Sequence, residues 1–331
     1  MQLTDEQRAL RDAVRTLLAK RSDSAAVRRA IEQPAGYDTE LWRTLCEQVG
    51  VAALAVPERH GGAGAGRREV QLVIAELGRA LTPSPLLGSV LASAVLAPLD
   101  EAALLRRVAA GTVATVAWAS EDGRWADGAF TDDDDRLTGT AHYVLDGDTA
   151  EILLAIAGGT VWEVDPADAD CVHTPTMDAT RRLATVRLDN APARQIGPLP
   201  QAALDEAIFA LAAEQVGAAE AIFERTVEYA KVRHQFGRPI GSFQALKHRM
   251  ADLHVRLEAA RSAAYGELPA SVVKAYCSVA FQAIAAEAIQ LHGGIAITWE
   301  HDAHLYFKRA HGSAALFGAP AEHVRRLEAE L

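Results

Sequence analysis

The sequence predicts an α+β chain in which a small β domain separates two helical domains. Three observations support this prediction: helical apolar periodicity before about residue 112, short β-branched runs after it, and helical periodicity again from about residue 199. The final helices are long enough to form an antiparallel bundle. We therefore expect an N-terminal helical domain over 1–112, a small middle β-barrel or sheet over 113–198 and a C-terminal four-helix bundle over 199–331.

Start and stop signals mark the helices of the N-terminal region. Thr4 and Gln7 form a capping-box pattern in front of an apolar repeat that begins at Leu10. The stretch "DTELWRTLCEQVG" predicts another helix, which Gly50 would end. The alanine- and leucine-rich segments "RREVQLVIAELGRAL" and "LGSVLASAVLA" predict two more helices.

The middle region has the texture of short strands. Runs such as "GTVATVAWA", "EILLAIA" and "LATVRLD" are rich in β-branched residues and are separated by Gly, Asp and Pro clusters. The acidic stretch "TDDDDRLTG" predicts a solvated β-turn. Helical periodicity then returns in three series, which run over residues 204–222, 246–257 and 273–291.

Composition excludes several classes of function. Half of the 331 residues are apolar and the net charge is -11, without a long Lys/Arg cluster, which disfavours nucleic-acid binding. The three cysteines, Cys46, Cys171 and Cys277, are far apart, which indicates a reducing cytoplasm rather than a disulfide framework or zinc site. The polar N-terminus and the absence of a long apolar run predict a cytoplasmic protein without a membrane span.

Some motifs favour ordinary structural roles. The stretch "HGGAGAG" at 60–66 has G-x-G spacing but no preceding strand, so an interhelical loop is favoured over a dinucleotide site. His292, His301 and His304 lie in one segment, yet no H-E-x-x-H or cysteine pattern accompanies them. We therefore expect no bound metal, and the missing G-x-S-x-G motif disfavours an α/β-hydrolase.

Two helix junctions in the C-terminal region carry more polar residues than a turn needs. In "RHQFGRPIGSFQ" a hairpin alone would explain Arg233 as a partner of the helix dipole. In "QLHGGI" a glycine cap explains Gly293 but not Gln290 or Gly294. Taken together, the two junctions predict a site for an extended anionic cofactor.

Each side chain at these junctions has a suitable chemistry for that ligand. Arg233 would neutralise a diphosphate, and Phe236 would pack on an adenine. The backbone of Gly293 and Gly294 would approach phosphate oxygens closely. Gln244 or Gln290 would form hydrogen bonds with other polar groups of the ligand.

The paired motifs R-x-x-F-G-x-x-I-G-x-F-Q and Q-x-x-G-G closely resemble the C-terminal domain of acyl-CoA dehydrogenases. The resemblance covers nearly the whole chain and implies FAD, α,β-desaturation of an acyl-CoA thioester, and electron transfer to an electron-transferring flavoprotein. It implies lipid metabolism, in fatty acid or steroid side-chain β-oxidation. It also implies a homo-oligomer or a hetero-oligomer with a paralogous subunit, because family bundles pack across dimer interfaces. The residues that would contact the FAD of a neighbouring subunit are Arg233, Phe236, Gly237, Gln244, Gln290, Gly293 and Gly294.

The chain departs from the family pattern in the catalytic region. The usual E-G-T motif appears as Phe317-Gly318-Ala319, so the usual catalytic glutamate is absent. The flavin-side loop near Ser120 matches weakly, and Ile152 stands where we place the family's flavin-facing tryptophan. The abrupt connection over 265–271 indicates a shortened helix or a missing segment.

A branch of the family takes its glutamate from the first bundle helix, where this chain has Ala207 preceded by Glu206. One residue rotates a side chain by about 100°, so Glu206 would be the base only if the helix were rewound or the register slipped. Glu214 lies roughly 12 Å further along the helix, too far to serve the same carbon.

The missing glutamate leaves three hypotheses open. The chain is an acyl-CoA dehydrogenase with Glu206 as a candidate base, a non-catalytic subunit that completes the FAD site of a paralogue, or a flavin monooxygenase or nitro-compound oxidase with the same fold. Steroid side-chain, branched and polyketide-derived acyl groups are all compatible with the sequence.

Overall fold

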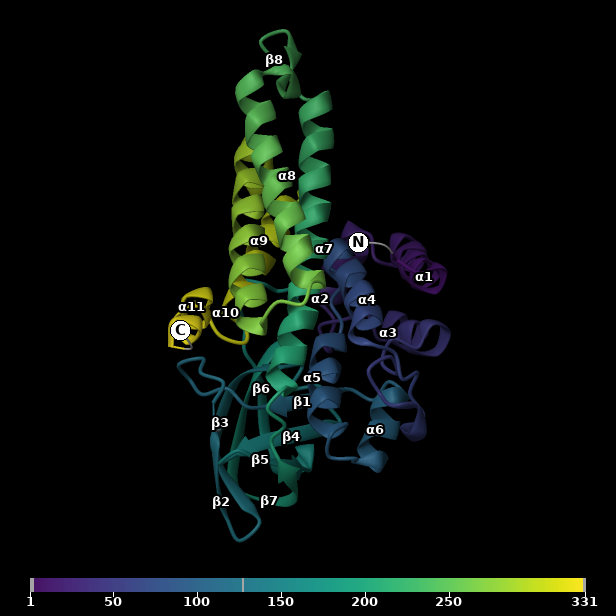
Figure 1. Ribbon diagram of the computed structural model, residues 1–331, viewed down its shortest axis with the longest axis vertical. Helices are drawn as coiled ribbons and strands as arrows, with labels where there is room; N and C mark the ends of the chain where they lie inside the picture. Colours follow the sequence, from purple (N-terminus) through teal and green to yellow (C-terminus); the bar gives the residue numbers. More distant parts are fainter. Residues whose placement is uncertain (1–2, 127, 330–331) are drawn as a thin grey trace.

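The computed structural model describes residues 3–126 and 128–329. The C-terminal bundle stands on a base that combines the N-terminal helices and the β domain, and the β8–β9 hairpin lies at the far end of the bundle (Figure 1). The order of helices, strands and helices confirms the predicted α+β fold.

The N-terminal helices begin and end where local signals place them. Thr4 and Gln7 form the predicted capping box, and Gly50 ends the second predicted helix in a left-handed conformation. That second helix continues beyond α3 as a short π-helical turn. The helices are α1 (Asp5–Arg21), α2 (Ser24–Ile31), α3 (Thr39–Thr44), α4 (Arg67–Ala80), α5 (Leu86–Leu96) and α6 (Ala102–Ala109).

The middle domain is a small closed sheet. Its ring of pairings runs β4-β2-β3-β7-β5 and back to β4, while β1 adds to β4 and β6 adds to β7. The predicted acidic turn connects β2 to β3. The strands are β1 (Ala114–Ala117), β2 (Phe130–Asp133), β3 (Arg136–Leu145), β4 (Ile152–Ala157), β5 (Thr160–Val164), β6 (Asp170–His173) and β7 (Leu183–Pro198).

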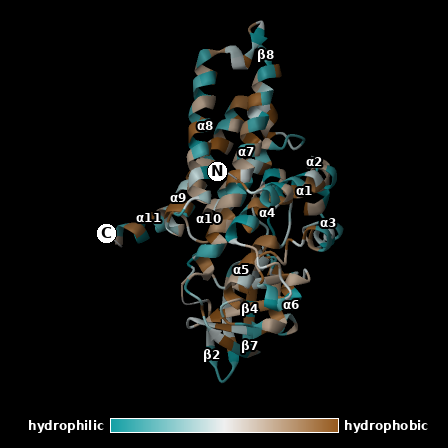
Figure 2. Ribbon diagram, turned by 45° about the vertical axis from the view of Figure 1, so that its right-hand side comes forward, coloured by the Kyte–Doolittle hydropathy of each residue, from teal (hydrophilic) through white to brown (hydrophobic). Residues whose placement is uncertain are grey.

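The bundle contains α7 (Ala203–Val232), α8 (Gln244–Tyr265), α9 (Ala270–His292) and α10 (Ala303–Ala315), followed by α11 (Pro320–Ala329). Four residues join α8 to α9, and a side chain at Gly266 would meet the carbonyl oxygen of Ser262 at 2.7 Å. The abrupt connection is therefore a tight turn between helices of 22 and 23 residues. Apolar residues lie between the bundle helices, and polar residues gather at the far end (Figure 2).

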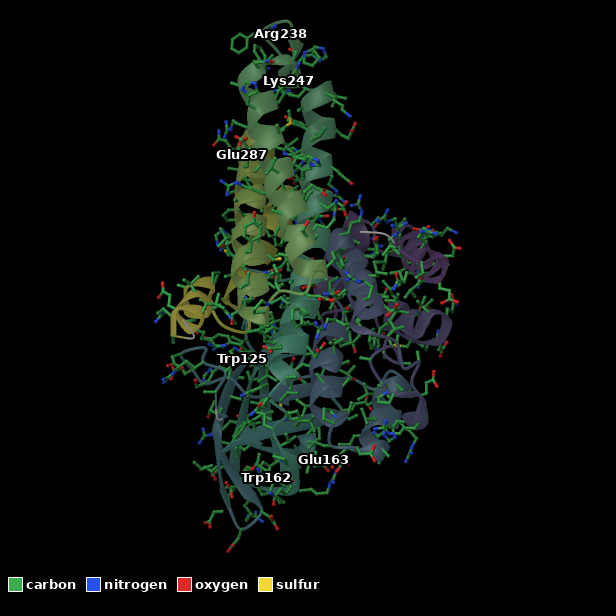
Figure 3. The ribbon with its side chains drawn as sticks, viewed as in Figure 1. Trp125, Trp162, Glu163, Arg238, Lys247 and Glu287 are labelled. Atoms are coloured by element: carbon green, nitrogen blue, oxygen red, sulfur yellow. The ribbon has the colours of Figure 1, made fainter. Side chains whose placement is uncertain are left out.

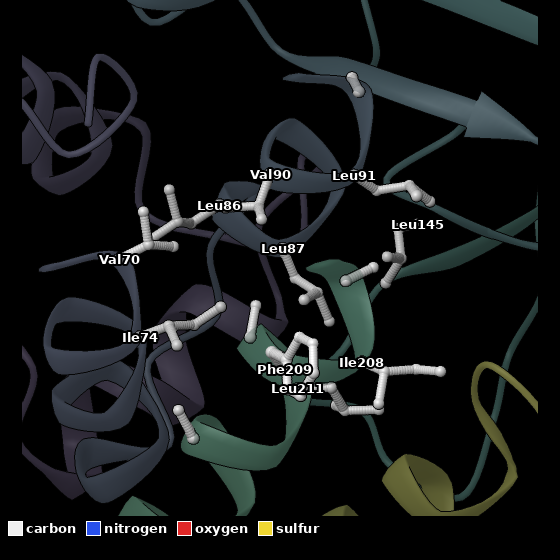
Figure 4. Close-up of a cluster of buried hydrophobic side chains, with 14 of the residues drawn as sticks. Val70, Ile74, Leu86, Leu87, Val90, Leu91, Leu145, Ile208, Phe209 and Leu211 are labelled. Carbon is white, nitrogen blue, oxygen red and sulfur yellow. The ribbon is translucent and has the colours of Figure 1, made fainter. Parts of the chain in front are cut away.

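The bundle joins the N-terminal domain through the crossing of α4 and α7. A Cβ atom added to Gly217 would lie 2.0 Å from the carbonyl oxygen of Ala75, and one added to Gly78 would lie 2.2 Å from that of Glu214. Only glycine permits this backbone approach. Apolar side chains of α4, α5 and α7, including Ile74, bury the adjoining surfaces (Figure 4).

A network of buried charges lies below that crossing. Arg309 of α10 is 2% exposed and forms ion pairs with Glu214 (Nη1 to Oε1, 2.6 Å) and Asp178 (Nε to Oδ2, 2.8 Å). It also donates to the carbonyl oxygen of Thr180 at 2.7 Å. Arg181 completes the network with a 2.5 Å ion pair to Glu214. The network therefore links the β domain to two bundle helices.

One segment is long and apolar enough to cross a membrane by length and composition alone. This segment of the described chain, Ala270–Ile297, includes α9, and half of its apolar 18-residue window is buried inside the protein. Since α9 packs against α7, α8 and α10, core packing accounts for its apolar character.

Candidate functional site

The loop after α7 forms a short hairpin. Strands β8 (His234–Gln235) and β9 (Arg238–Pro239) are joined by Phe236 and Gly237, whose φ angles are 53° and 74°. Two successive positive φ angles are typical of the tight turn that matches strand twist in hairpins. The amide of Ile240 donates to the carbonyl oxygen of Arg233 at 2.7 Å and closes the loop.

The predicted ligand groups of this hairpin face outward. The Phe236 ring is 92% exposed and has the edge of Phe243 as an aromatic neighbour, with ring centroids 6.2 Å apart. Arg233 is exposed and forms no side-chain hydrogen bond or ion pair within the described chain. Gln244, the first residue of α8, is also exposed. Arg238 and Lys247 lie at the same end of the bundle (Figure 3).

The second motif forms an open turn at the end of α9. Gln290 is exposed in the last helical turn, and Gly293 caps the helix with a φ of 68°. A Cβ atom added to Gly293 or Gly294 would have no atom within 4 Å. The backbone of this turn is therefore open to close approach by another molecule.

Tyr229 brings the two motifs together. Its carbonyl oxygen accepts from the amide of Arg233 at 2.9 Å, and its hydroxyl donates to the carbonyl oxygen of His292 at 3.3 Å. The Tyr229 and His292 rings are stacked with centroids 4.4 Å apart. The seven residues predicted to bind FAD thus lie at one end of the bundle, although about sixty residues separate the motifs.

Residues beyond the motifs hold this end in place. The His292 ring contacts the His301 ring at a centroid distance of 4.7 Å, and burial lowers the pKa of both histidines. Asp302 then binds Ser24 (2.5 Å), Arg28 (3.0 Å) and Arg225 (2.7 Å), which tie the turn to α2 and α7. Among described residues, no group of three His, Cys, Asp or Glu side chains is placed to hold a metal ion.

A second region, at the base of the bundle, is closed by aromatic rings. Phe317, which replaces the family glutamate, is fully buried. Trp125 of the loop after β1 meets Phe317 edge-on with centroids 4.9 Å apart, and it meets Trp118 at 5.8 Å. Phe317 also has a φ of 61°, which is uncommon for a bulky residue. Figure 3 shows Trp125 where the bundle meets the β domain.

A cavity of about 250 Å³ adjoins these rings. Tyr143 lines it and donates from its hydroxyl to the carbonyl oxygen of Glu121 at 3.1 Å. Ile152 lies in the buried start of β4, whereas Tyr143 lies at a register irregularity of β3.

The candidate base Glu206 lies elsewhere. Arg67 binds its carboxylate with two contacts, Nε to Oε2 at 3.0 Å and Nη2 to Oε1 at 2.5 Å. Glu206 lines a different cavity, between α4, α5 and α7, rather than the one beside Trp125. The α7 helix is continuous there, without the rewinding that a catalytic role would require.

Other carboxylates fit the role of base no better. Glu214 is committed to the buried ion pairs described above. Two carboxylates line the cavity beside Trp125. Of these, Asp122 is bound by Ser120 and Arg124, and the Ser120 hydrogen bond lowers its pKa. Glu322 of α11 is the other.

Comparisons with known proteins agree with this architecture. The N-terminal domain model of acyl-CoA dehydrogenases matches residues 4–103, and the C-terminal domain model matches residues 198–330. Acyl-CoA dehydrogenase IpdE2 of Mycobacterium tuberculosis is 49% identical over 335 residues, covering 99% of this chain and 98% of the relative. The protein of the same name in Mycolicibacterium smegmatis is 44% identical, covering 99% and 100%.

Solved structures with the same architecture include complexes of two different chains. A chain of the ChsE4-ChsE5 complex from Mycobacterium tuberculosis has a TM-score of 0.90 and 28% identity, covering 99% of this chain and 98% of its own. A chain of the Tcur3481-Tcur3483 steroid ACAD G363A variant has a TM-score of 0.88 and 30% identity, covering 98% and 97%. The chain therefore belongs to the acyl-CoA dehydrogenase family, whose members are FAD-dependent oxidoreductases, and this confirms the predicted family, fold, activity and cofactor.

Proposed function

We propose that this chain works as one subunit of a mixed acyl-CoA dehydrogenase oligomer. It would supply contacts to the adenosine diphosphate part of FAD at a site whose catalytic glutamate belongs to a paralogous partner. The contact between Trp125 and Phe317 carries the proposal, because these rings occupy the place where the family pattern has the glutamate. Removal of a proton from the substrate would then fall to the partner.

The residues at the far end of the bundle fit FAD. The unpaired guanidinium of Arg233 provides the donors that a diphosphate binds, and the open backbone at Gly293 and Gly294 admits phosphate oxygens. The exposed ring of Phe236 offers a flat apolar face to an adenine. Both motifs face away from the chain's own core, which favours a cofactor held mainly by another subunit.

When bound, FAD accepts the hydride that leaves the β-carbon of the thioester. This chain's residues would bind and orient the cofactor. Arg233 would offset the charge of the diphosphate, and Gln244 and Gln290 would fix the position of the cofactor through hydrogen bonds. The stacked Tyr229 and His292 rings would keep the two motifs at a constant separation. Electrons would then pass to an electron-transferring flavoprotein.

The substrate we propose is the CoA thioester of a steroid-derived acid. Support comes from the descriptions of two structural relatives. Both descriptions name two chains, and one of them is also that of a steroid ACAD. Within this chain, Leu87, Leu145, Ile208 and Leu211 are all buried in the cluster of Figure 4, between α5, α7 and the β domain. Because these side chains fill the region in this chain, the thioester would bind in the equivalent region of the partner.

Co-expression with a glutamate-bearing paralogue tests the proposal. We expect little flavin and no desaturation of acyl-CoA from this chain alone, and bound FAD and activity in the mixed oligomer. Flavin absorbance per oligomer and anaerobic bleaching by a thioester panel measure the two quantities. Robust dehydrogenation by the isolated chain, lost in Glu206→Gln or Glu322→Gln, would contradict the proposal. Oxygen consumption without any response to thioesters would support the monooxygenase hypothesis instead.

A further inference from the structure

A cavity of about 320 Å³ lies between α4, α5 and the start of α7. Its volume falls within the range of about 300–1,000 Å³ that is usual for small-molecule sites. Around the start of α7 it is lined by the N-cap residue Ala202 and by Glu206 and Ala210, which follow at intervals of about one turn. It shares no lining residue with the cavity beside Trp125.

The wall of this cavity is mainly apolar and built from short side chains. Val70 of α4 and Val90 of α5 form part of it, together with Ala94 of α5 and its C-cap residue Ala97 (Figure 4 shows both valines). Short side chains on three helices leave the space open, whereas larger residues on the same helices fill the neighbouring core. An apolar molecule placed here would gain from loss of contact with water.

Two buried polar side chains each have an oxygen in this space that forms no hydrogen bond within the described residues. Ser93 is 2% exposed, lines the cavity, and its hydroxyl forms no hydrogen bond within the described residues. Gln71 is 3% exposed and also lines the cavity. Its Nε2 donates to the carbonyl oxygen of Ala264 at 2.8 Å, while its Oε1 accepts nothing from the described chain. Neither atom is fully enclosed by the protein, so both remain free to pair with a molecule that enters the cavity.

The charged pair at the edge of the cavity is already balanced. Arg67 and Glu206 bind each other through two contacts, and the guanidinium also lies 3.9 Å from the centre of the Phe209 ring. A ligand carboxylate would have to displace Glu206, and a ligand cation would have to displace Arg67. The site therefore favours a molecule without net charge.

We infer that this cavity is a second binding site, which takes a compact, uncharged, apolar molecule carrying a hydroxyl group. The hydroxyl would donate to Gln71 Oε1 and accept from Ser93, since a carboxamide oxygen only accepts and a serine hydroxyl does both. The inference does not depend on FAD or on the proposed oligomer, because neither motif of the cofactor site borders the cavity.

Three fluorescent or quenching probes test the site on the full chain without flavin: 2-naphthol, naphthalene and 2-naphthoate. We expect saturable binding of 2-naphthol and affinities at least about tenfold lower for naphthalene, which lacks the hydroxyl, and for 2-naphthoate, which is charged. Equal affinity for all three probes, or no saturable binding of 2-naphthol, would overturn the inference.

Matched variants locate the binding. Ser93→Ala should weaken 2-naphthol about tenfold and leave naphthalene unchanged. Ser89→Ala is the control, because Ser89 lies on the same helix, is 1% exposed and also has an unpaired hydroxyl, but does not line the cavity. Ala94→Phe should fill the space and abolish binding of both probes. If that variant does not fold, equal effects of Ser93→Ala and Ser89→Ala would still refute the site.

Discussion

Polar groups are exposed at the far end of the bundle and buried in ion pairs at its base. At the far end, Arg233 is exposed and unpaired within the described chain, and the Gly293–Gly294 backbone faces open space. At the base, Arg309 is buried and satisfied by Glu214 and Asp178. Polar groups at the far end are open to another molecule, whereas Arg309 is paired within the chain. This difference supports the proposal that a cofactor and a partner subunit meet the far end.

The same contrast separates the aromatic rings. Phe236 exposes 92% of its surface, whereas Phe317 exposes none. An exposed ring beside an unpaired cation favours recognition of a cofactor, and a buried ring in contact with Trp125 favours packing.

The largest effect on stability is expected at the base of the bundle, around Arg309. Arg309→Met should lower the free energy of unfolding by about 3–5 kcal/mol, because Asp178 would remain buried without a cation and Glu214 would keep only Arg181. Urea unfolding followed by circular dichroism measures this change. Arg309→Met combined with Glu214→Gln should recover part of the loss. A loss below about 1 kcal/mol in the single variant would show that the base is not held by this network.

A smaller effect is expected at the far end, on binding rather than on folding. Arg233→Ala should weaken FAD in the mixed oligomer by about 1.5–3 kcal/mol, since a charge-assisted contact to the diphosphate is lost. Fluorescence titration with FAD measures the affinity. Arg187→Ala, an exposed arginine of β7, serves as the control. Unchanged FAD affinity in Arg233→Ala would show that Arg233 only caps the helix.

The pH dependence of stability tests the buried region at the base of the bundle. Burial raises the pKa of Asp146 from 3.8 to about 7. Because the folded state then holds a proton that the unfolded state releases, this group stabilises the fold below pH 4, and the contribution is lost as pH rises toward 7. Relative to Asp146→Asn, the wild type should lose about 1 kcal/mol per pH unit in that window. Parallel stability curves of the two proteins would contradict the raised pKa.

The smallest effect concerns Glu206. Its ion pair with Arg67 is partly exposed, with side-chain exposures of 45% for Arg67 and 35% for Glu206. Glu206→Gln should therefore change stability by less than about 1 kcal/mol and leave dehydrogenation by the mixed oligomer unaltered. Steady-state assays with saturating thioester measure the activity. Loss of activity with intact FAD content would assign Glu206 a catalytic part after all.

The fold could be predicted largely from local signals. The capping box at Thr4 and Gln7, the glycine at 50 and the change from period 3.6 to short strands all correspond to elements of the structure. These signals act over a few residues, so they are readable in sequence. The order of pairing within the closed sheet depends on contacts between distant residues and was not predicted.

The candidate site was predictable only where a motif was contiguous. Both cofactor motifs were identified, yet Tyr229 and Asp302, which hold them together, carry no motif of their own. Trp125 and Phe317 lie 192 positions apart, and their contact follows from the docking of the β domain on the bundle.

The buried ring at position 317 also constrains the history of the chain. A single change back to glutamate would place a carboxylate against the edge of Trp125, in a fully buried position where ionisation is strongly disfavoured. Regaining a base there would require the tryptophan to shrink first, and that change alone would leave a cavity in the core. Each single step is unfavourable, so the packing of Phe317 against Trp125 opposes the return of a carboxylate at this position.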